Sequence, residues 1–139
     1  MKNDCIFCKI INGDIPCFKV FEDNQTLAFM DINPVSEGHA LVIPKRHSAN
    51  AFEIEDEDIA AVAGTARRVA RAINVVLQPE GMNLVQCNGP AAQQSVLHFH
   101  MHVLPRAMND NVPLNWELNA GDMQAIGELA ERIGAVVGQ

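Results

Sequence analysis

The sequence predicts an α+β fold whose sheet is mostly antiparallel. Residues 18–23 and 26–32 alternate between apolar and polar side chains on either side of a polar turn, which is the pattern of a β-hairpin. Apolar residues within 56–78 recur at intervals of three and four, which indicates a long amphipathic helix. Hairpin strands with separate helices favour the α+β class. A chain of this length fits one domain (1–139) with a single core.

The first half of the chain also carries a short helix and a buried strand. Residues 5–12 are followed by Gly13 and Pro16, which end a short helix before the hairpin. Residues 40–45 form a continuous apolar run that Pro44 ends, as expected of a buried strand.

The second half of the chain begins with the long helix. Asp56 and Asp58 favour its N-terminus electrostatically. The remaining predicted elements are strands 82–87 and 97–104, the loop 88–95 between them, and an amphipathic helix that follows a cap at Asp122 and carries Met123, Ile126, Leu129, Ile133 and Val136.

The composition argues against some classes of partner. A net charge of −7 argues against a nucleic-acid-binding surface or an anionic membrane surface, which need a basic face, although a few local donors can hold one phosphorylated ligand. No apolar run is long enough to span a bilayer and no signal peptide is visible, so we expect a cytoplasmic protein. There Cys5, Cys8, Cys17 and Cys87 should be reduced or bound to metal.

Three of the five histidines lie in the segment LHFHMHVLPR (97–106). His98, His100 and His102 share one face of the predicted strand, while the apolar residues between them face a helix. At ~3.3 Å rise per residue, the Cα atoms of His98 and His102 are about 13 Å apart. Zinc holds histidine nitrogens at about 2.0–2.1 Å, so one metal cannot easily bind all three. Burying three imidazoles without partners is costly, so we expect a functional site here.

A second set of candidate functional residues begins with Cys5 and Cys8, which form a C-x-x-C pair. A thioredoxin-like redox motif is expected near a βαβ pattern, and none precedes this pair. Structural zinc needs two more ligands, for which the histidines are the remaining candidates. A Cys₂His₂ site is therefore possible, and the alternatives are two buried apolar cysteines or a redox pair.

His39 and His47 flank the strand at 40–45 and are expected to serve different ends of the sheet, because eight extended residues span roughly 26 Å. If this strand runs antiparallel to the histidine strand, one register brings His47 towards His98 and His39 towards His102. The opposite assignment is also compatible with the spacing, since the sequence does not fix the strand direction. In the first register the two clusters are Cys5, Cys8, His47 and His98 at one end, and His39, His100 and His102 at the other.

The segment HFHMHVL resembles the signature of the histidine-triad (HIT) nucleotide-binding proteins. CIFCKIINGDIP, LAFMDINPVSEGHALVIPKRH and NGPAAQQSVLHFHMHVLPR resemble successive blocks of the Hint-like bacterial branch, in the same order. The resemblance covers residues 4–106, whereas 107–139 match much less well. It implies a HIT-like fold and a homodimer whose sheet continues across the subunit interface.

The resemblance also implies roles for individual residues. His100 matches the nucleophile that attacks the α-phosphorus of a purine nucleotide and forms a nucleotidyl-histidine intermediate, which water hydrolyses. His39 and His102 match the other active-site histidines, and Asp31 matches the ribose-binding acid. The remaining matches are Phe7, Ile10, Phe29 and Ile32 for the purine pocket, Asn88 and Ser95 for the α-phosphate side with Gln94 as a further donor in that loop, and Cys5, Cys8, His47 and His98 for one structural zinc per chain.

The expected reaction is hydrolysis, because the nucleotidyltransferase relatives replace the third histidine with Gln and His102 is retained here. Phosphoramidates, aminoacyl adenylates and dinucleoside polyphosphates all present a nucleoside α-phosphate, so the leaving group stays open, with AMP as the representative bound nucleotide. The alternatives are a non-catalytic purine nucleotide-binding regulatory module and a redox protein that uses Cys5 and Cys8.

Overall fold

A computed structural model describes residues 4–138, which form a five-stranded antiparallel sheet and three α-helices. Within this part of the chain, none of the helices is both long and apolar enough to cross a membrane. The predicted α+β class is confirmed. The strands are β1 (Lys19–Glu22), β2 (Thr26–Met30), β3 (Ala40–Pro44), β4 (Gly81–Gln86) and β5 (Met101–Arg106), in the sheet order β1-β2-β3-β5-β4, and the helices are α1 (Ile6–Ile11), α2 (Asp56–Leu77) and α3 (Met123–Val137), with a 3-10 turn at Pro90–Ala92.

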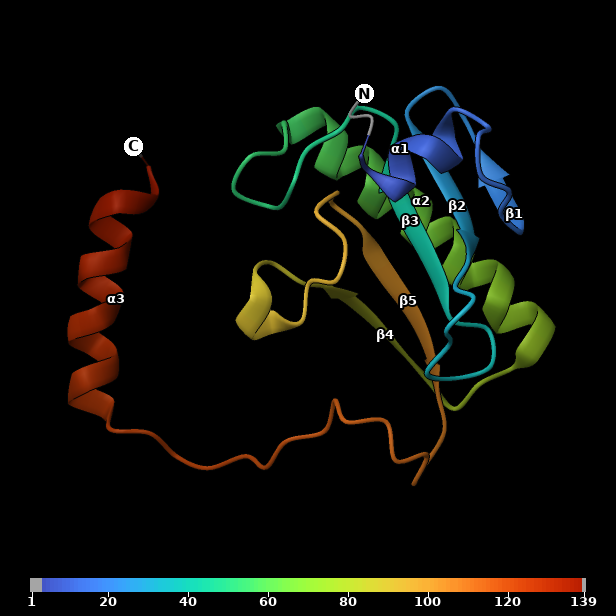
Figure 1. Ribbon diagram of the computed structural model, residues 1–139. Coiled ribbons are helices and arrows are strands. Elements are labelled where there is room, and N and C mark those ends of the chain that lie inside the picture. The colour runs from blue at the N-terminus through green and yellow to red at the C-terminus, as the bar shows by residue number, and fades with distance from the viewer. Residues whose placement is uncertain (1–3, 139) are drawn as a thin grey trace.

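The main core lies between α2 and the sheet, as Figure 1 shows. The periodic apolar residues of α2 are buried there, including Val62 and Val69. Phe99 and Val103, which alternate with the histidines, are fully buried in the same cluster. The prediction that the residues between the histidines pack under a helix is therefore confirmed. Helix α1 covers a second apolar cluster, in which Phe7 packs with Phe29 and other residues of β2 and β3.

The histidine strand begins later than the sequence predicts. Strand β5 starts at Met101, so the prediction of a strand over 97–104 is wrong for its first four residues. The backbone N–H of Phe99 donates to the carbonyl of Ser48 at 2.7 Å, which ties this stretch to the segment after β3. His98 and His100 thus precede the ladder, and only His102 lies within it.

The pairing of β3 with β5 determines which histidines meet. The two strands are antiparallel, with Leu41 opposite His102 and Ala40 opposite Val103. This register brings His39, just before β3, next to His102. Of the two assignments compatible with the spacing, the structure has the one that brings His47 towards His98 and His39 towards His102.

Candidate functional site

Cys5, Cys8, His47 and His98 form a compact cluster at one end of the sheet, and their ligand atoms all lie within 4.8 Å of one another. The Nδ1 atoms of His47 and His98 are 3.1 Å apart, and each lies 3.4 Å from a cysteine Sγ. A tetrahedral zinc with ordinary bond lengths places sulfur and nitrogen about 3.5 Å apart and two nitrogens about 3.3 Å apart. The residues therefore fit a structural zinc ion.

Hydrogen bonds around this cluster orient Cys5 and His98 towards its centre. Cys5 caps α1, and its Sγ accepts the backbone N–H of Cys8 at 3.4 Å. His98 Nε2 lies 2.8 Å from the Pro44 carbonyl, so it carries the proton and leaves Nδ1 for a metal. Burial lowers the pKa of His98 to about 4, which keeps the imidazole in the neutral form that binds metal.

Outside this cluster, His39 and His102 are joined by a hydrogen bond, and the bonds around them determine which nitrogen of each ring carries the proton. The backbone N–H of Val35 donates to His39 Nδ1 at 3.2 Å, so the proton of neutral His39 is on Nε2. His39 Nε2 lies 2.9 Å from His102 Nδ1 and donates to it. The proton of neutral His102 is therefore on Nε2, where it can be donated to a ligand.

His100 lies between His98 of the cysteine cluster and His102, and it is 2 % exposed. Its Nδ1 is 2.8 Å from the main-chain carbonyl of His98, to which it donates. This bond leaves the lone pair of His100 on Nε2. Burial lowers the pKa of His100, so the imidazole is neutral near pH 7. The Phe7 ring contacts His100 edge-on at a centroid distance of 5.2 Å and limits how the imidazole can turn.

Asp31 supplies a negative charge beside this chain of imidazoles. Its Oδ2 lies 3.4 Å from His39 Nε2, and its Oδ1 accepts the N–H of Asn33 at 2.8 Å. The carboxylate raises the pKa of His39, of His100 and of His102, but burial has the larger effect and lowers all three. Asp31 is half-buried, so it borders the histidines while still facing solvent.

The residues predicted for the purine pocket differ in their surroundings. Phe7 and Phe29 are buried and meet edge to face at 5.6 Å. Ile10 packs against the same cluster. Ile32, in contrast, is 76 % exposed.

In the loop between β4 and β5, the side chains of Asn88 and Gln94 are engaged in hydrogen bonds within the protein. Asn88 exchanges hydrogen bonds with Gln86 and accepts the N–H of Ala51 at 2.8 Å. Gln94 accepts the N–H of Gly89 and donates to two carbonyls, including that of Ala49 at 2.6 Å. These amides brace the loop against the segment after β3.

Ser95 is exposed and lies along a surface hollow with Cys5 and His47, on the side of the metal ligands. Three main-chain contacts to the histidines were not predicted from the sequence. They are made by the N–H of Val35, the carbonyl of Pro44 and the carbonyl of His98, which leave no side-chain signal.

The HIT domain matches residues 12–109 of the chain. The chain belongs to the HIT family. Among its relatives, an adenosine 5'-monophosphoramidase of Schizosaccharomyces pombe is 42 % identical over 89 % of this HIT protein and 93 % of the relative. An adenylylsulfatase of Arabidopsis thaliana is 35 % identical over 98 % of this chain and 69 % of the relative.

Solved structures of related proteins have the same fold. A Streptococcus mutans protein superposes with a TM-score of 0.93 at 39 % identity, over 99 % of this HIT protein and 87 % of that chain. A zinc-bound histidine-triad protein from Mycobacterium smegmatis superposes with a TM-score of 0.75 at 35 % identity, over 95 % of this chain and 97 % of the other. The predicted family membership is therefore confirmed.

The protonation of His102 gives a testable pH dependence for this HIT protein. Burial, with smaller effects from His100 and His39, lowers the pKa of His102 to about 4 from an ordinary value of 6.5. Protonated His102 cannot accept the His39 N–H. We expect kcat/KM to stay level from about pH 7 to 5.5 and to fall below about pH 4.5. A pH–rate profile with an inflection near the ordinary histidine value would contradict this assignment.

The same shift affects stability with a defined sign. Between the folded and the unfolded pKa of His102, the unfolded chain binds more protons than the folded one. The contribution of neutral His102 to stability is therefore complete above pH 6.5 and is lost as the pH falls towards 4. Circular dichroism at each pH separates this loss of fold from a loss of catalysis.

Proposed function

We propose that this HIT protein is a hydrolase that releases nucleoside monophosphates from purine nucleoside phosphoramidates or related adenylates, with His100 as the nucleophile. The supporting observation is the bond from His100 Nδ1 to the His98 carbonyl, which leaves a neutral imidazole with its lone pair on Nε2. The names of the two relatives, a monophosphoramidase and an adenylylsulfatase, support cleavage at an adenylyl phosphorus.

The proposed reaction proceeds in two steps. His100 Nε2 attacks the α-phosphorus, and the bond from phosphorus to the leaving group breaks, so that the leaving group departs with its electron pair and a proton from solvent. Water then attacks the phosphorus of the nucleotidyl-histidine, releases the monophosphate and restores neutral His100. His102 Nε2–H donates a hydrogen bond to the phosphate or the leaving group during both steps.

The proposed nucleotide site extends away from the histidines on two sides. Asp31 accepts the ribose hydroxyls, since a carboxylate can accept from both. Because the side-chain amides of Asn88 and Gln94 are already bonded, these residues contribute by bracing the loop, and the hydroxyl of the exposed Ser95 is the loop's candidate donor to the phosphate. The base lies against the apolar residues, which are Phe7, Ile10, Phe29 and Ile32.

We also propose that Cys5, Cys8, His47 and His98 hold one zinc ion per chain. The fit of the four ligand atoms to a tetrahedral site supports this, as does the zinc-bound relative. Since all four positions come from the protein, the ion would be structural and would anchor α1 to the segment before β5. This geometry also favours a metal site over a redox role for the two cysteines.

Steady-state assays test the proposed activity. The protein is incubated with adenosine phosphoramidate, an aminoacyl adenylate and a dinucleoside polyphosphate, and AMP release is followed by chromatography. We expect turnover of the phosphoramidate. Tight AMP binding without turnover of any of the three would instead identify a non-catalytic nucleotide-binding module.

Replacing Asp31 tests the ribose contact. We expect the wild-type protein to prefer a ribonucleotide substrate over its 2'-deoxy analogue by about tenfold or more, because a carboxylate without its hydroxyl partner loses a hydrogen bond. Asp31→Asn should reduce this ratio to below about threefold. The ratio separates the ribose contact from any effect of Asp31 on the histidines. Asp14→Asn, an exposed acid after α1, is the matched control and should leave the ratio unchanged.

We propose further that the chain forms a homodimer in which the sheet continues across the subunit interface. Strand β4 is an outer strand of the sheet, so its free edge can pair with a second copy. Exposed apolar side chains lie beside this edge, including Leu84 on β4 and Val75 on α2. Sedimentation at several concentrations tests the dimer.

A further inference from the structure

The C-terminal helix α3 is amphipathic, yet no part of the chain that the structure describes buries its apolar face. Its apolar residues recur at intervals of three and four and form one stripe. None of the α3 residues that the structure describes is buried. The exposed fraction of the six apolar side chains of this stripe ranges from 49 % to 76 %, and they are Met123, Ile126, Leu129, Ile133, Val136 and Val137.

Helix α3 is poorly suited to stand alone in water. It has 15 residues, which is close to the length below which isolated helices are marginal. Gly127 and Gly134 lie in its interior and weaken it further. A sequence of this kind forms a stable helix when its apolar stripe is packed against another surface.

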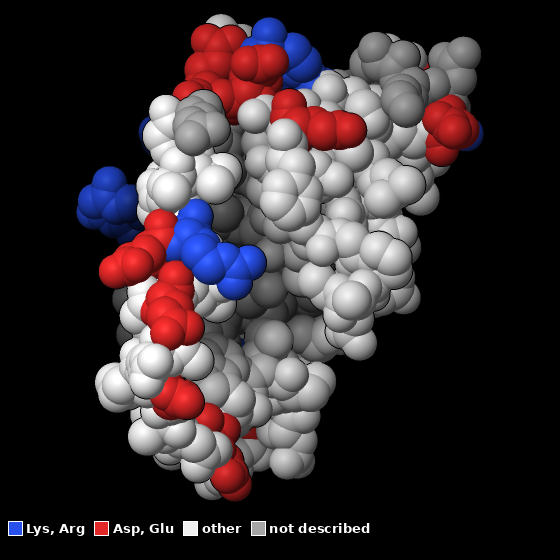
Figure 2. Space-filling view, turned by 90° about the vertical axis from the view of Figure 1, so that its left-hand side faces the viewer, with Lys and Arg blue, Asp and Glu red and all other residues white. Residues whose placement is uncertain are grey.

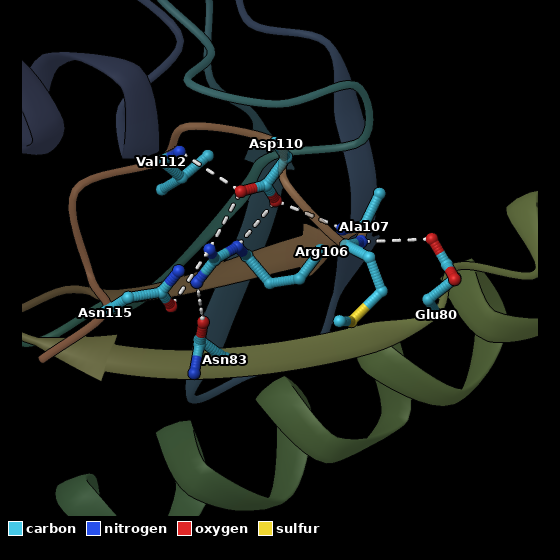
Figure 3. A network of polar contacts seen from close by, with 8 residues as sticks. Glu80, Asn83, Arg106, Ala107, Asp110, Val112 and Asn115 are labelled. Carbon is cyan, nitrogen blue, oxygen red and sulfur yellow. Dashed lines mark hydrogen bonds and ion pairs between the residues drawn. The ribbon is translucent and has the colours of Figure 1, made fainter. Parts of the chain in front are cut away.

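The segment 107–122 leads from β5 to α3, and its first residues are held by the network of polar contacts in Figure 3. The Arg106 guanidinium binds the carboxylate of Asp110 at 2.7 and 2.9 Å and Asn83 on β4 at 2.7 Å. Asp110 in turn accepts the backbone N–H groups of Ala107 and Val112 at 3.1 Å each. The start of the segment is thereby tied to β4 and β5.

The placement of α3 away from the domain is shared with a solved relative. Figure 1 shows the segment running along the lower side of the domain and α3 standing well apart from the sheet. The superposition on the Streptococcus mutans protein covers 99 % of this chain at a TM-score of 0.93, so it includes α3. A helix whose apolar stripe stays exposed beside its own domain is stabilised when another chain covers that stripe.

The space beside α3 suits an apolar occupant. Figure 2 shows α3 as a column next to the domain, with a hollow between them and few charged side chains on the domain surface that borders it. Two further apolar side chains, Trp116 and Leu118, are exposed on the segment that leads to α3.

We propose that α3 is an arm that docks on a second copy of this chain, with the two arms exchanged reciprocally. At roughly 80 Å² for each of its six apolar side chains, one arm covers about 500 Å². Two arms with the surfaces that they cover therefore bury about 2,000 Å², which is the size of a stable protein–protein interface. The arms thus supply enough area to hold a dimer together.

Mixed isotope labelling tests the exchange in the full-length, wild-type protein. One preparation carries ¹³C-labelled isoleucine methyl groups and the other is deuterated with protonated aromatic rings, and the two are unfolded and refolded together. The arm exchange predicts intermolecular NOEs from the methyl groups of Ile126 and Ile133. Intramolecular NOEs alone, which report an arm folded back on its own domain, would overturn the proposal, and so would an arm with no NOE to any domain.

A pair of matched variants tests the energetic role of the stripe. We expect Leu129→Asp with Ile133→Asp to weaken the dimer by about 100-fold or more in sedimentation experiments. Glu128→Asp with Glu131→Asp places the same residue type on the opposite face of α3 and should change the dissociation constant by less than about threefold. An unchanged dissociation constant in the stripe variant would overturn the arm exchange while leaving a dimer made through β4 intact.

Discussion

His100→Ala should reduce kcat/KM for adenosine phosphoramidate by at least about 10⁴-fold. The proposed reaction forms its covalent bond at Nε2 of this residue, and an alanine side chain has no atom that can attack phosphorus. His102 remains in the variant, but its Nδ1 accepts from His39, so it is not available as a substitute in the same orientation. A rapid-quench experiment should detect a nucleotidyl adduct on the wild-type peptide that contains His100 and none on the variant.

The matched control for this experiment is His102→Ala, which should lose about 10²-fold, because its proposed contribution is one hydrogen bond to the phosphate or leaving group. Both variants should keep the proposed zinc, since neither residue belongs to the cluster of Cys5, Cys8, His47 and His98. Equal activity of His100→Ala and the wild type would show that another group is the nucleophile.

Removal of Cys8, a proposed metal ligand, should have the largest effect on stability. Cys8 is 2 % exposed and packs in the apolar cluster beneath α1. We expect Cys8→Ala to lower the zinc content from about one per chain to near zero. The loss of the ion and of the packing around it should lower the melting temperature by roughly 10 °C or more, since binding to the folded state alone stabilises that state.

Cys17→Ala is the matched control for Cys8→Ala, because Cys17 packs against the same apolar cluster but lies outside the ligand set. It should keep its zinc and shift the melting temperature by only a few degrees. Elemental analysis and thermal unfolding of both variants, prepared without chelators, give the comparison. Wild-type protein without zinc would contradict the proposed metal site.

The sequence predicted well those elements that depend on local periodicity. Helix α2 and the burial of Phe99 and Val103 beneath it follow from regular spacing, which is a property of one segment at a time. The start of β5 was predicted wrongly because it depends on the bond between Phe99 and Ser48, two residues that are far apart in the sequence. Boundaries set by such distant contacts have no local signal.

For the candidate site, the sequence predicted which side chains come together but not the main-chain hydrogen bonds that orient them. The cluster around Cys5 and His98 was anticipated from ligand chemistry, spacing and family resemblance, and the register of β3 with β5 selected it. The tautomers of His39 and His100, in contrast, depend on the N–H of Val35 and the carbonyl of His98. Every residue carries these groups, so the sequence cannot indicate which of them will be used.

His98 connects the cysteine cluster to the proposed nucleophile, and this connection should make the activity sensitive to oxidation of the cysteines. Its imidazole belongs to the metal cluster, while its carbonyl holds the proton of His100. An oxidant that modifies the thiol of Cys5 or Cys8 would release the zinc and free the His98 backbone that orients the nucleophile. We therefore expect peroxide treatment to abolish hydrolysis in step with zinc release. The protein would then be inactivated by thiol oxidation although its chemistry uses no thiol.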